Sequence, residues 1–383
     1  MLQHLKKLRT TIKNNFKDPA EDIHPYLRNY YTAFMETENA NADLVGKEKV
    51  QFAHEKGFFY NSAVLYNLNE SNYLEYLSDY EYFKLFPMNG NYAFWINDKL
   101  TLMYTLREYK EYLPKYYFHI GEEHKVYSLL DYKHTELYKS SQDKDSLHSE
   151  TILKLLESEK ALIAKPVVGA VSSGLHVLKC QNGVYYDNKN EITKDNLLAL
   201  LDSLNEYIVE EFIDFVGQMP ENSDCIRLVV LNKDGYNPEV VCAYLIMDNI
   251  GAATDDTIYF PSYVVSINLE TGLFEDTRYI NFYANISSLK KAPVVNRVFE
   301  YTIPEHQIVG SIPLWKEIKE KTEEICKSIP QLSYLGLDVI ITKDSFKILE
   351  INSHQDPVCQ IYTPFLKKGT PSEVFFKEAL NRQ

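Results

Sequence analysis

The chain reads LGLDVIITKDSFKILEINSH from residue 335 to residue 354. Two apolar runs flank Lys343-Asp344-Ser345, and this pattern predicts a β-hairpin with a three-residue loop. The predicted register places Asp338 directly opposite Glu350. Asn352 is predicted to lie on the same face as Glu350, because residues two apart on a strand share a face. The other face is predicted to be apolar and to carry Val339, Ile341, Leu349 and Ile351.

Two carboxylates and an amide on one face suit Mg²⁺, which binds a few carboxylates together with phosphate oxygens and waters. Carboxylates that face each other across neighbouring strands destabilise a sheet unless something neutralises them. The hairpin therefore predicts a metal site formed by Asp338, Glu350 and Asn352. The alternative is that the two acids lie on the solvated face of a half-buried hairpin.

A second pattern lies at residues 161–179, where two strand-like runs flank a loop of small residues, 169–174. Glycines in such a loop allow backbone N–H groups to approach phosphate oxygens. The loop contains Gly169, Ser172, Ser173 and Gly174, and Lys165 precedes it at the end of the first run. The lysine ammonium can bind the same phosphates. The alternative is an ordinary hairpin with a flexible tip, because the loop is neither a Walker A loop nor GxGxxG.

Two further strands carry charged residues. Residues 207–213 read YIVEEFI, and an apolar strand with Glu210 and Glu211 can hold an adenine ring by its backbone edge while a carboxylate accepts from the base. The alternative is an edge strand with two solvated acids. Arg227 lies where the apolar run CIRLVVL begins, and its guanidinium can bind a phosphate bidentately or form a structural ion pair.

Composition excludes several classes of protein. The 383 residues carry 40 Lys and Arg against 54 Asp and Glu, a net charge of −14, which argues against a nucleic-acid-binding protein. The five cysteines are far apart and contain no CxxC pair, so they indicate neither a disulfide framework nor a zinc site. No apolar run reaches the roughly 18 residues of a membrane span, and we expect a cytoplasmic protein.

The first 92 residues are predicted to be largely helical. Residues 1–17 have an apolar stripe at helical spacing among five Lys and Arg, a pattern that fits either peripheral contact with the inner face of a membrane or packing on the protein itself. Residues 26–82 also have a helical pattern. A short buried strand is predicted at 93–98 and a helix at 99–112.

Taken in order, these motifs resemble the ATP-grasp superfamily. The most similar group is the sugar-transfer-associated ATP-grasp group of bacterial polysaccharide loci, and the resemblance covers residues 93–383. Four segments carry it: SDCIR at 223–227, NLETG at 268–272, GSIPLWKEI at 310–318 and GLDVIIT at 336–342. In addition, INDKL at 96–100 resembles the Asp-Lys turn that opens the ATP-binding region of D-alanine–D-alanine ligase-like members.

The resemblance implies an α+β ATP-grasp fold, in which two α+β subdomains clamp ATP, preceded by the helical region 1–92. Residues 93–215 would form the linker and small subdomain, and 216–383 the large subdomain with the metal-binding hairpin. The implied roles are phosphate binding by Lys99, Lys165 and the 169–174 loop, adenine binding by Glu210, Glu211 and the backbone near Phe212, catalysis by Arg227 and Lys165, and Mg²⁺ binding by Asp338, Glu350 and Asn352.

The implied activity is an ATP-dependent ligase. A carboxylate would be activated as an acyl phosphate and then coupled to an amine or a sugar-linked acceptor, with ATP and Mg²⁺ as cofactors. The alternatives are an ATP-grasp phosphotransferase that acts on a hydroxyl and a nucleotide-binding module without turnover.

Overall fold

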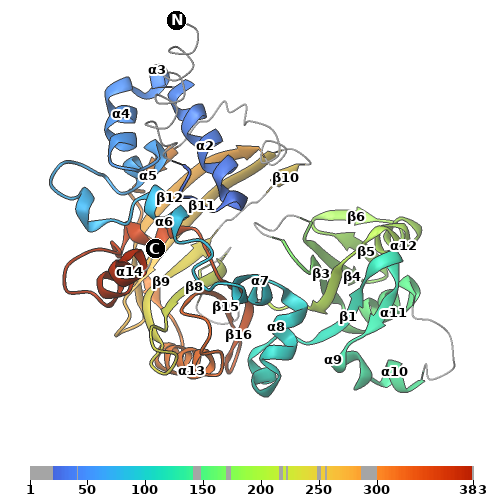
Figure 1. Ribbon diagram of the computed structural model, residues 1–383. Coiled ribbons are helices and arrows are strands. Elements are labelled where there is room, and N and C mark those ends of the chain that lie inside the picture. The colour runs from blue at the N-terminus through green and yellow to red at the C-terminus, as the bar shows by residue number, and fades with distance from the viewer. Residues whose placement is uncertain are drawn as a thin grey trace, which may run out of the picture.

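The computed structural model describes residues 20–40, 42–140, 148–169, 174–214, 219–220, 223–247, 252–254, 257–285 and 300–381. The basic segment 1–17, for which membrane contact and packing on the protein itself were the two alternatives, and the loop residues Ser172 and Ser173 lie outside these ranges. Within the described ranges, no helix is both long and apolar enough to cross a membrane. Two antiparallel sheets, each with its own helices, form two lobes (Figure 1).

Short helices make up the N-terminal region, which confirms the helical pattern of residues 26–82. They are α2 (Pro25–Ala40), α3 (Ala42–Val45), α4 (Lys47–Glu55), α5 (Tyr60–Leu65), the 3₁₀ turn η1 (Tyr73–Glu75) and α6 (Asp79–Lys84). Two buried carboxylates join them, because Glu38 of α2 accepts from the Tyr60 N–H at 2.6 Å and Asp79 of α6 accepts from the Phe59 N–H at 2.8 Å. Both acids thus lie at the N-terminus of α5, where backbone N–H groups favour negative charge.

Asp79 is expected to make stability depend on pH. Burial raises the pKa of Asp79 from 3.8 to about 7, although hydrogen bonds from Phe59 and Ser62 oppose the shift. The folded protein then binds more protons than the unfolded chain between about pH 4 and 7, so stability falls as pH rises through this window, by up to about 4 kcal/mol. Asp79→Asn keeps one acceptor oxygen, for the Phe59 N–H, and cannot ionise. Urea unfolding at pH 5 and pH 8 should show a smaller loss in this variant than in the wild type, and equal losses would contradict the assignment.

The smaller lobe contains a seven-stranded sheet in the order β2-β1-β7-β3-β4-β5-β6. Its strands are β1 (Tyr116–Ile120), β2 (Val126–Ser128), β3 (Ala161–Pro166), β4 (His176–Gln181), β5 (Val184–Asp187), β6 (Asn190–Ile192) and β7 (Tyr207–Glu211). Its helices are α9 (Leu130–Lys133), α10 (Glu136–Ser140), α11 (Ser149–Glu159) and α12 (Lys194–Ser203), with the 3₁₀ turn η3 (Glu122–His124). Strand β7 lies between β1 and β3 and is therefore not the edge strand of the alternative interpretation.

The larger lobe contains nine strands along the path β13-β12-β11-β9-β8-β15-β16, with β10 beside β11 and β14 beside β12. The strands are β8 (Ser223–Leu231), β9 (Glu239–Met247), β10 (Ala252–Thr254), β11 (Thr257–Ile267), β12 (Leu273–Asn285), β13 (Glu300–Thr302), β14 (Gly310–Ser311), β15 (Tyr334–Ile341) and β16 (Phe346–Asn352). The remaining elements are α13 (Trp315–Lys327), the 3₁₀ turn η5 (Pro357–Ile361) and α14 (Pro371–Asn381).

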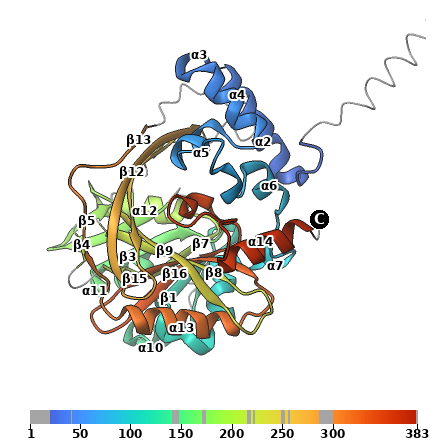
Figure 2. The same cartoon turned by 90° about the vertical axis from the view of Figure 1, so that its left-hand side faces the viewer.

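Different segments cover the two faces of the larger sheet. One apolar core joins the sheet to α13 and to residues 96–113, through side chains such as Ile318 and Leu102. The other core joins it to the N-terminal helices, η5 and α14, through side chains such as Phe58 and Phe376. Figure 2 shows the N-terminal helices and α13 on opposite sides of the molecule.

The prediction of a strand at 93–98 is wrong. This segment forms the short helix α7 (Tyr92–Ile96), which buries Ala93 and Ile96, three residues apart, as a helix does. A short apolar run has no clear period, and the sequence alone therefore did not distinguish a strand from a buried helix. The helix predicted at 99–112 is present as α8 (Lys99–Thr105) followed by the 3₁₀ segment η2 (Arg107–Tyr112).

Candidate functional site

Strands β15 and β16 form the predicted hairpin, and Asp338 lies directly opposite Glu350 as expected. Beyond this pair the register shifts by one residue, so that Val339 pairs with Ile348 and Leu349 is bulged out. The connecting loop is four residues long, 342–345, rather than three. The predicted apolar face is wrong at one position because of the bulge. Ile348 is buried there, whereas Leu349, which was predicted on that face, is half-buried.

The bulge contacts Lys165, one of the two lysines predicted to bind phosphate. The carbonyl of Leu349 accepts a hydrogen bond from Lys165 Nζ at 3.1 Å. The same ammonium lies 2.6 Å from Glu210 Oε1, and both side chains are almost fully buried. The C-terminal ends of β3 and β7 and the bulge of β16 therefore meet at Lys165, which connects the two lobes.

Lys99 is the second lysine at the hairpin. It begins α8, whose first turn is capped by Asp98 through a 2.7 Å bond from the Thr101 N–H. Its ammonium donates to the carbonyl of Gly169 at 3.1 Å and lies 3.4 Å from Glu350 Oε2. Gly169 opens the small-residue loop, so Lys99 links that loop to the hairpin.

Arg227 completes the cluster from β8. Its Nε donates to Asp338 Oδ1, and its Nη2 donates to Asp338 Oδ2 at 3.0 Å, in the planar two-bond geometry typical of arginine and carboxylate. Its Nη1 donates to Gln355 Oε1 at 3.0 Å. Asn352 lies beside Glu350, donating to Glu350 Oε1 at 3.1 Å. The structure therefore brings Arg227, Lys99, Lys165, Glu210, Asp338, Glu350 and Asn352 together, and we call these seven residues the hairpin cluster.

The charges of the hairpin cluster explain how two facing carboxylates coexist. Burial raises the pKa of Asp338 to about 6, although the Arg227 guanidinium opposes the shift. Burial also acts to raise the pKa of Glu350, but Lys99 and Lys165 outweigh it and hold that pKa at about 2. Both carboxylates are therefore ionised at neutral pH, which is the form that binds a metal ion.

Other predicted site residues lie outside the hairpin cluster. Glu211 accepts from the Lys115 N–H at 3.1 Å, on the opposite face of β7 from Glu210. The Phe212 ring lies beneath the Lys179 ammonium, 4.8 Å from ring centroid to Nζ. Gly174 has φ +73° beside the Tyr207 hydroxyl. Ser172 and Ser173 are not among the described residues.

Comparison with known families gives one match over most of the chain. Residues 88–368 match the model of the sugar-transfer associated ATP-grasp family. The chain belongs to this family. No curated protein matches the sequence. The match begins after the N-terminal helices, the last of which, α6, ends at Lys84.

Solved ATP-grasp structures are similar at low identity. The complex of the ATP-grasp ligase PsnB with minimal precursor, Mg and ADP has 12% identity and a TM-score of 0.36 over 77% of this chain and 61% of that chain. D-alanine–D-alanine ligase from Bacillus anthracis has 12% identity and a TM-score of 0.34 over 75% and 65%. L-amino acid ligase from Bacillus licheniformis has 11% identity and a TM-score of 0.35 over 83% and 52%. The chain thus spans less than two thirds of each of these proteins.

Two amide side chains of this ATP-grasp protein were not predicted from sequence. The side-chain oxygen of Gln355 accepts from Arg227, and the backbone carbonyl of Gln355 accepts from the Tyr82 hydroxyl of the N-terminal region. Asn89 bonds to the backbone of both Tyr334 and Ser353, at the start and just past the end of the hairpin. No sequence motif marks either amide, because their partners lie more than 100 residues away. Together they fix the hairpin from the N-terminal side.

Gly336→Ala is expected to destabilise the protein and to disturb Arg227. An added Cβ would lie 1.6 Å from Gln355 Oε1, so the amide must leave its position beside the guanidinium. We expect a loss of about 1–3 kcal/mol, the usual cost of overpacking, measured by urea unfolding. Because the three atoms nearest the added Cβ all belong to Gln355, the double variant Gly336→Ala/Gln355→Ala should recover most of that loss. No recovery would place the strain elsewhere.

Proposed function

We propose that this protein is an ATP-dependent ligase that activates a carboxylate as an acyl phosphate and couples it to an amine, in the modification of a cell-surface polysaccharide or glycan precursor. The observation that carries the proposal is the hairpin cluster, where three cationic and three carboxylate side chains meet. The description of the family as sugar-transfer associated supports a sugar-linked acceptor.

The hairpin cluster fits Mg²⁺ and a nucleotide. Asp338, Glu350 and Asn352 offer only oxygen ligands, the donor type that Mg²⁺ prefers. Among the described residues, the hairpin included, no three His, Cys, Asp or Glu side chains are grouped so that they could hold a metal ion, and the proposed site therefore depends on the Asn352 amide as its third ligand. Glu210 Oε2 is buried and lacks a hydrogen-bond partner among the described residues, as expected of an acceptor completed by a ligand's N–H.

In this proposal MgATP supplies the phosphoryl group that activates the carboxylate. Lys99 and Lys165 neutralise phosphate charge, and the buried position of both lysines strengthens that interaction. Arg227, which binds both Asp338 oxygens in this structure, would bind the transferring phosphoryl group, and Asp338, Glu350 and Asn352 would hold Mg²⁺. Catalysis then rests on positioning and charge neutralisation, without a protein nucleophile.

The test is a calorimetric titration of ATP into the wild type, with Mg²⁺ and with EDTA, followed by ADP-release assays with a panel of carboxylates and hydroxylamine. A ligase yields Mg²⁺-dependent binding and an acyl hydroxamate. A phosphotransferase yields a phosphorylated alcohol and no hydroxamate, and a binding module yields binding without ADP release. Absence of Mg²⁺-dependent ATP binding contradicts all three.

A further inference from the structure

The three residues that follow strand β16, 353–355, are held by side chains and backbone from the region before α8. The N–H of Ser353 donates to Asn97 Oδ1 at 3.0 Å, and its hydroxyl donates to the carbonyl of Ala93 at 3.1 Å. The carbonyl of Ser353 accepts from Asn89 Nδ2 at 3.3 Å. The first residue past the hairpin is therefore fixed by the segment around α7.

Tyr82 of α6 holds the other two residues. Its ring is stacked on the ring of His354, with the two centroids 4.3 Å apart, and its hydroxyl donates to the backbone carbonyl of Gln355. The side chain is almost fully buried, at 3% exposed. Tyr82 precedes residue 88, where the family match begins, so this support for the hairpin comes from outside the matched residues.

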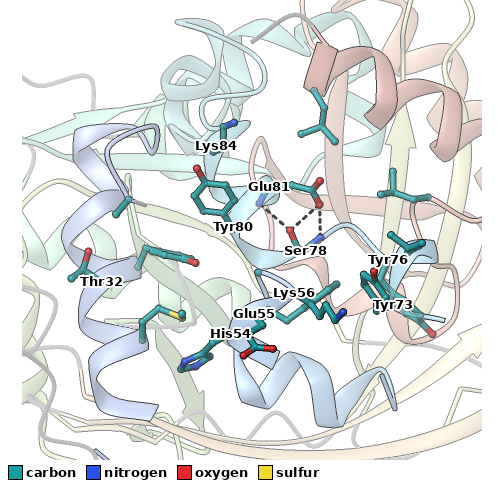
Figure 3. Close-up of a pocket in the computed structure, with 18 of the residues that line it drawn as sticks. Thr32, His54, Glu55, Lys56, Tyr73, Tyr76, Ser78, Tyr80, Glu81 and Lys84 are labelled. Carbon is teal, nitrogen blue, oxygen red and sulfur yellow. Dashed lines mark hydrogen bonds between the residues drawn. The ribbon is translucent and has the colours of Figure 1, made fainter. Parts of the chain in front are cut away.

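Local structure fixes Tyr82 itself. Ser78 caps the start of α6, where its hydroxyl accepts from the Glu81 N–H at 3.2 Å and its own N–H donates to the Glu81 carboxylate at 3.0 Å (Figure 3). This reciprocal pair is a capping box, which satisfies N–H groups that the first turn of a helix leaves unpaired. Tyr82 follows Glu81 directly and therefore projects from a helix whose first turn is fixed.

The side chain of Gln355 connects this support to Arg227. Gln355 Oε1 accepts from Arg227 Nη1 at 3.0 Å, and the amide presents its oxygen there because a guanidinium only donates. The amide packs directly on Gly336 of β15, where an added Cβ would collide with it. Asp338 accepts from Nε and Nη2 of the same guanidinium. Arg227 is thus held on two sides, and Tyr82 anchors the residue on one of them.

We propose that Tyr82 is a positioning residue for phosphoryl transfer, acting through Gln355 to fix the guanidinium of Arg227. The inference rests on the role proposed above for Arg227. In that step a carboxylate oxygen forms a bond to the γ-phosphorus of ATP while the bond to ADP breaks, and ADP takes the electron pair. Donors that are already in place need no reorganisation as this charge moves, and a misplacement of about 1 Å can cost on the order of 100-fold in rate.

The test is calorimetric titration of the full chain with MgATP, with MgADP, and with MgADP plus aluminium fluoride, which mimics a phosphoryl group in transit and requires no known carboxylate. Analogues of a transition state bind at least about 100-fold more tightly than ground-state ligands, so fluoride should tighten MgADP binding to the wild type. Tyr82→Phe keeps the ring on His354 and removes the hydroxyl. We expect it to bind MgATP within about twofold of the wild type and to lose about tenfold of the fluoride-dependent tightening.

Tyr66→Phe is the matched control. Tyr66 is a buried tyrosine of the N-terminal region, 5% exposed, and its hydroxyl donates to the carbonyl of Pro357 at 3.1 Å, two residues beyond Gln355. We expect this variant to lose about as much stability as Tyr82→Phe in urea unfolding and to keep the full tightening by fluoride. A role in folding alone would make the two variants behave alike in the titration.

Gln355→Met is the second variant, because it removes the amide beside Arg227 and keeps a side chain of similar length. We expect it to lose the fluoride-dependent tightening as Tyr82→Phe does. The double variant Tyr82→Phe/Gln355→Met should lose no more than Gln355→Met alone, since two residues that act through one contact are not additive.

Full tightening in Tyr82→Phe or in Gln355→Met overturns the inference and leaves the ligase proposal intact. An equal loss in Tyr66→Phe, or additive losses in the double variant, overturns it as well. A wild type that binds MgATP without any tightening by fluoride contradicts the phosphoryl role of Arg227 and the inference with it, whereas a wild type that does not bind MgATP contradicts the proposed function itself.

Discussion

Glu350→Ala is expected to abolish Mg²⁺-dependent binding of ATP. The substitution removes one of the two carboxylates that face each other across the hairpin. It also leaves Lys99 without this carboxylate, whose Oε2 lies 3.4 Å from Lys99 Nζ. Loss of a residue that merely supports a metal ligand commonly costs 10–100-fold in affinity, so loss of the ligand itself should cost at least about 100-fold. Calorimetric titration of ATP with Mg²⁺ and with EDTA measures the effect.

Asp344→Ala is the matched control for Glu350→Ala. Asp344 is an exposed acid in the loop of the same hairpin, so its removal changes the net charge equally without touching the hairpin cluster. We expect this variant to bind MgATP as the wild type does. If Glu350→Ala also binds MgATP normally, the hairpin is not the metal site, and its acids act only as partners of the buried cations.

Lys165→Met is expected to have the largest effect on stability. The substitution leaves Glu210, which is 3% exposed, without its partner at 2.6 Å. Removing one member of a buried ion pair typically costs about 3–5 kcal/mol, because the remaining charge loses its compensation. Protonation of Glu210 limits the loss, because burial already raises the pKa of this carboxyl. Urea unfolding at pH 7 measures the change.

The double variant Lys165→Met/Glu210→Gln separates the structural role of Lys165 from its proposed phosphate role. Without the buried acid, stability should recover to near the wild-type value. MgATP binding should stay weaker than in the single variant Glu210→Gln, which loses the same acid but keeps the ammonium. Recovery of both properties would mean that Lys165 serves only to neutralise Glu210.

The sequence was sufficient where chemistry and structure are local. Counting residues from a three-residue loop gave the facing pair Asp338 and Glu350 correctly, but only because the bulge at Leu349 offsets the one-residue error in the predicted loop. The order of the motifs likewise gave the family that the match over residues 88–368 shows. The one-residue bulge at Leu349 was missed, because a bulge depends on neighbouring packing and has no fixed sequence signal.

Tertiary structure alone decided which charges meet. In sequence, Lys165 and Glu210 are 45 residues apart and Arg227 and Asp338 are 111 apart, yet each pair is in direct contact. Neighbouring antiparallel strands place Arg227 directly opposite Asp338, and Lys165 diagonally across from Glu210. The same holds for α7, whose apolar run became a helix on the larger sheet, and for Tyr82 and Gln355, which tie the N-terminal region to the hairpin. Local periodicity fixes which face a side chain takes, whereas its partner is set by which elements pack together.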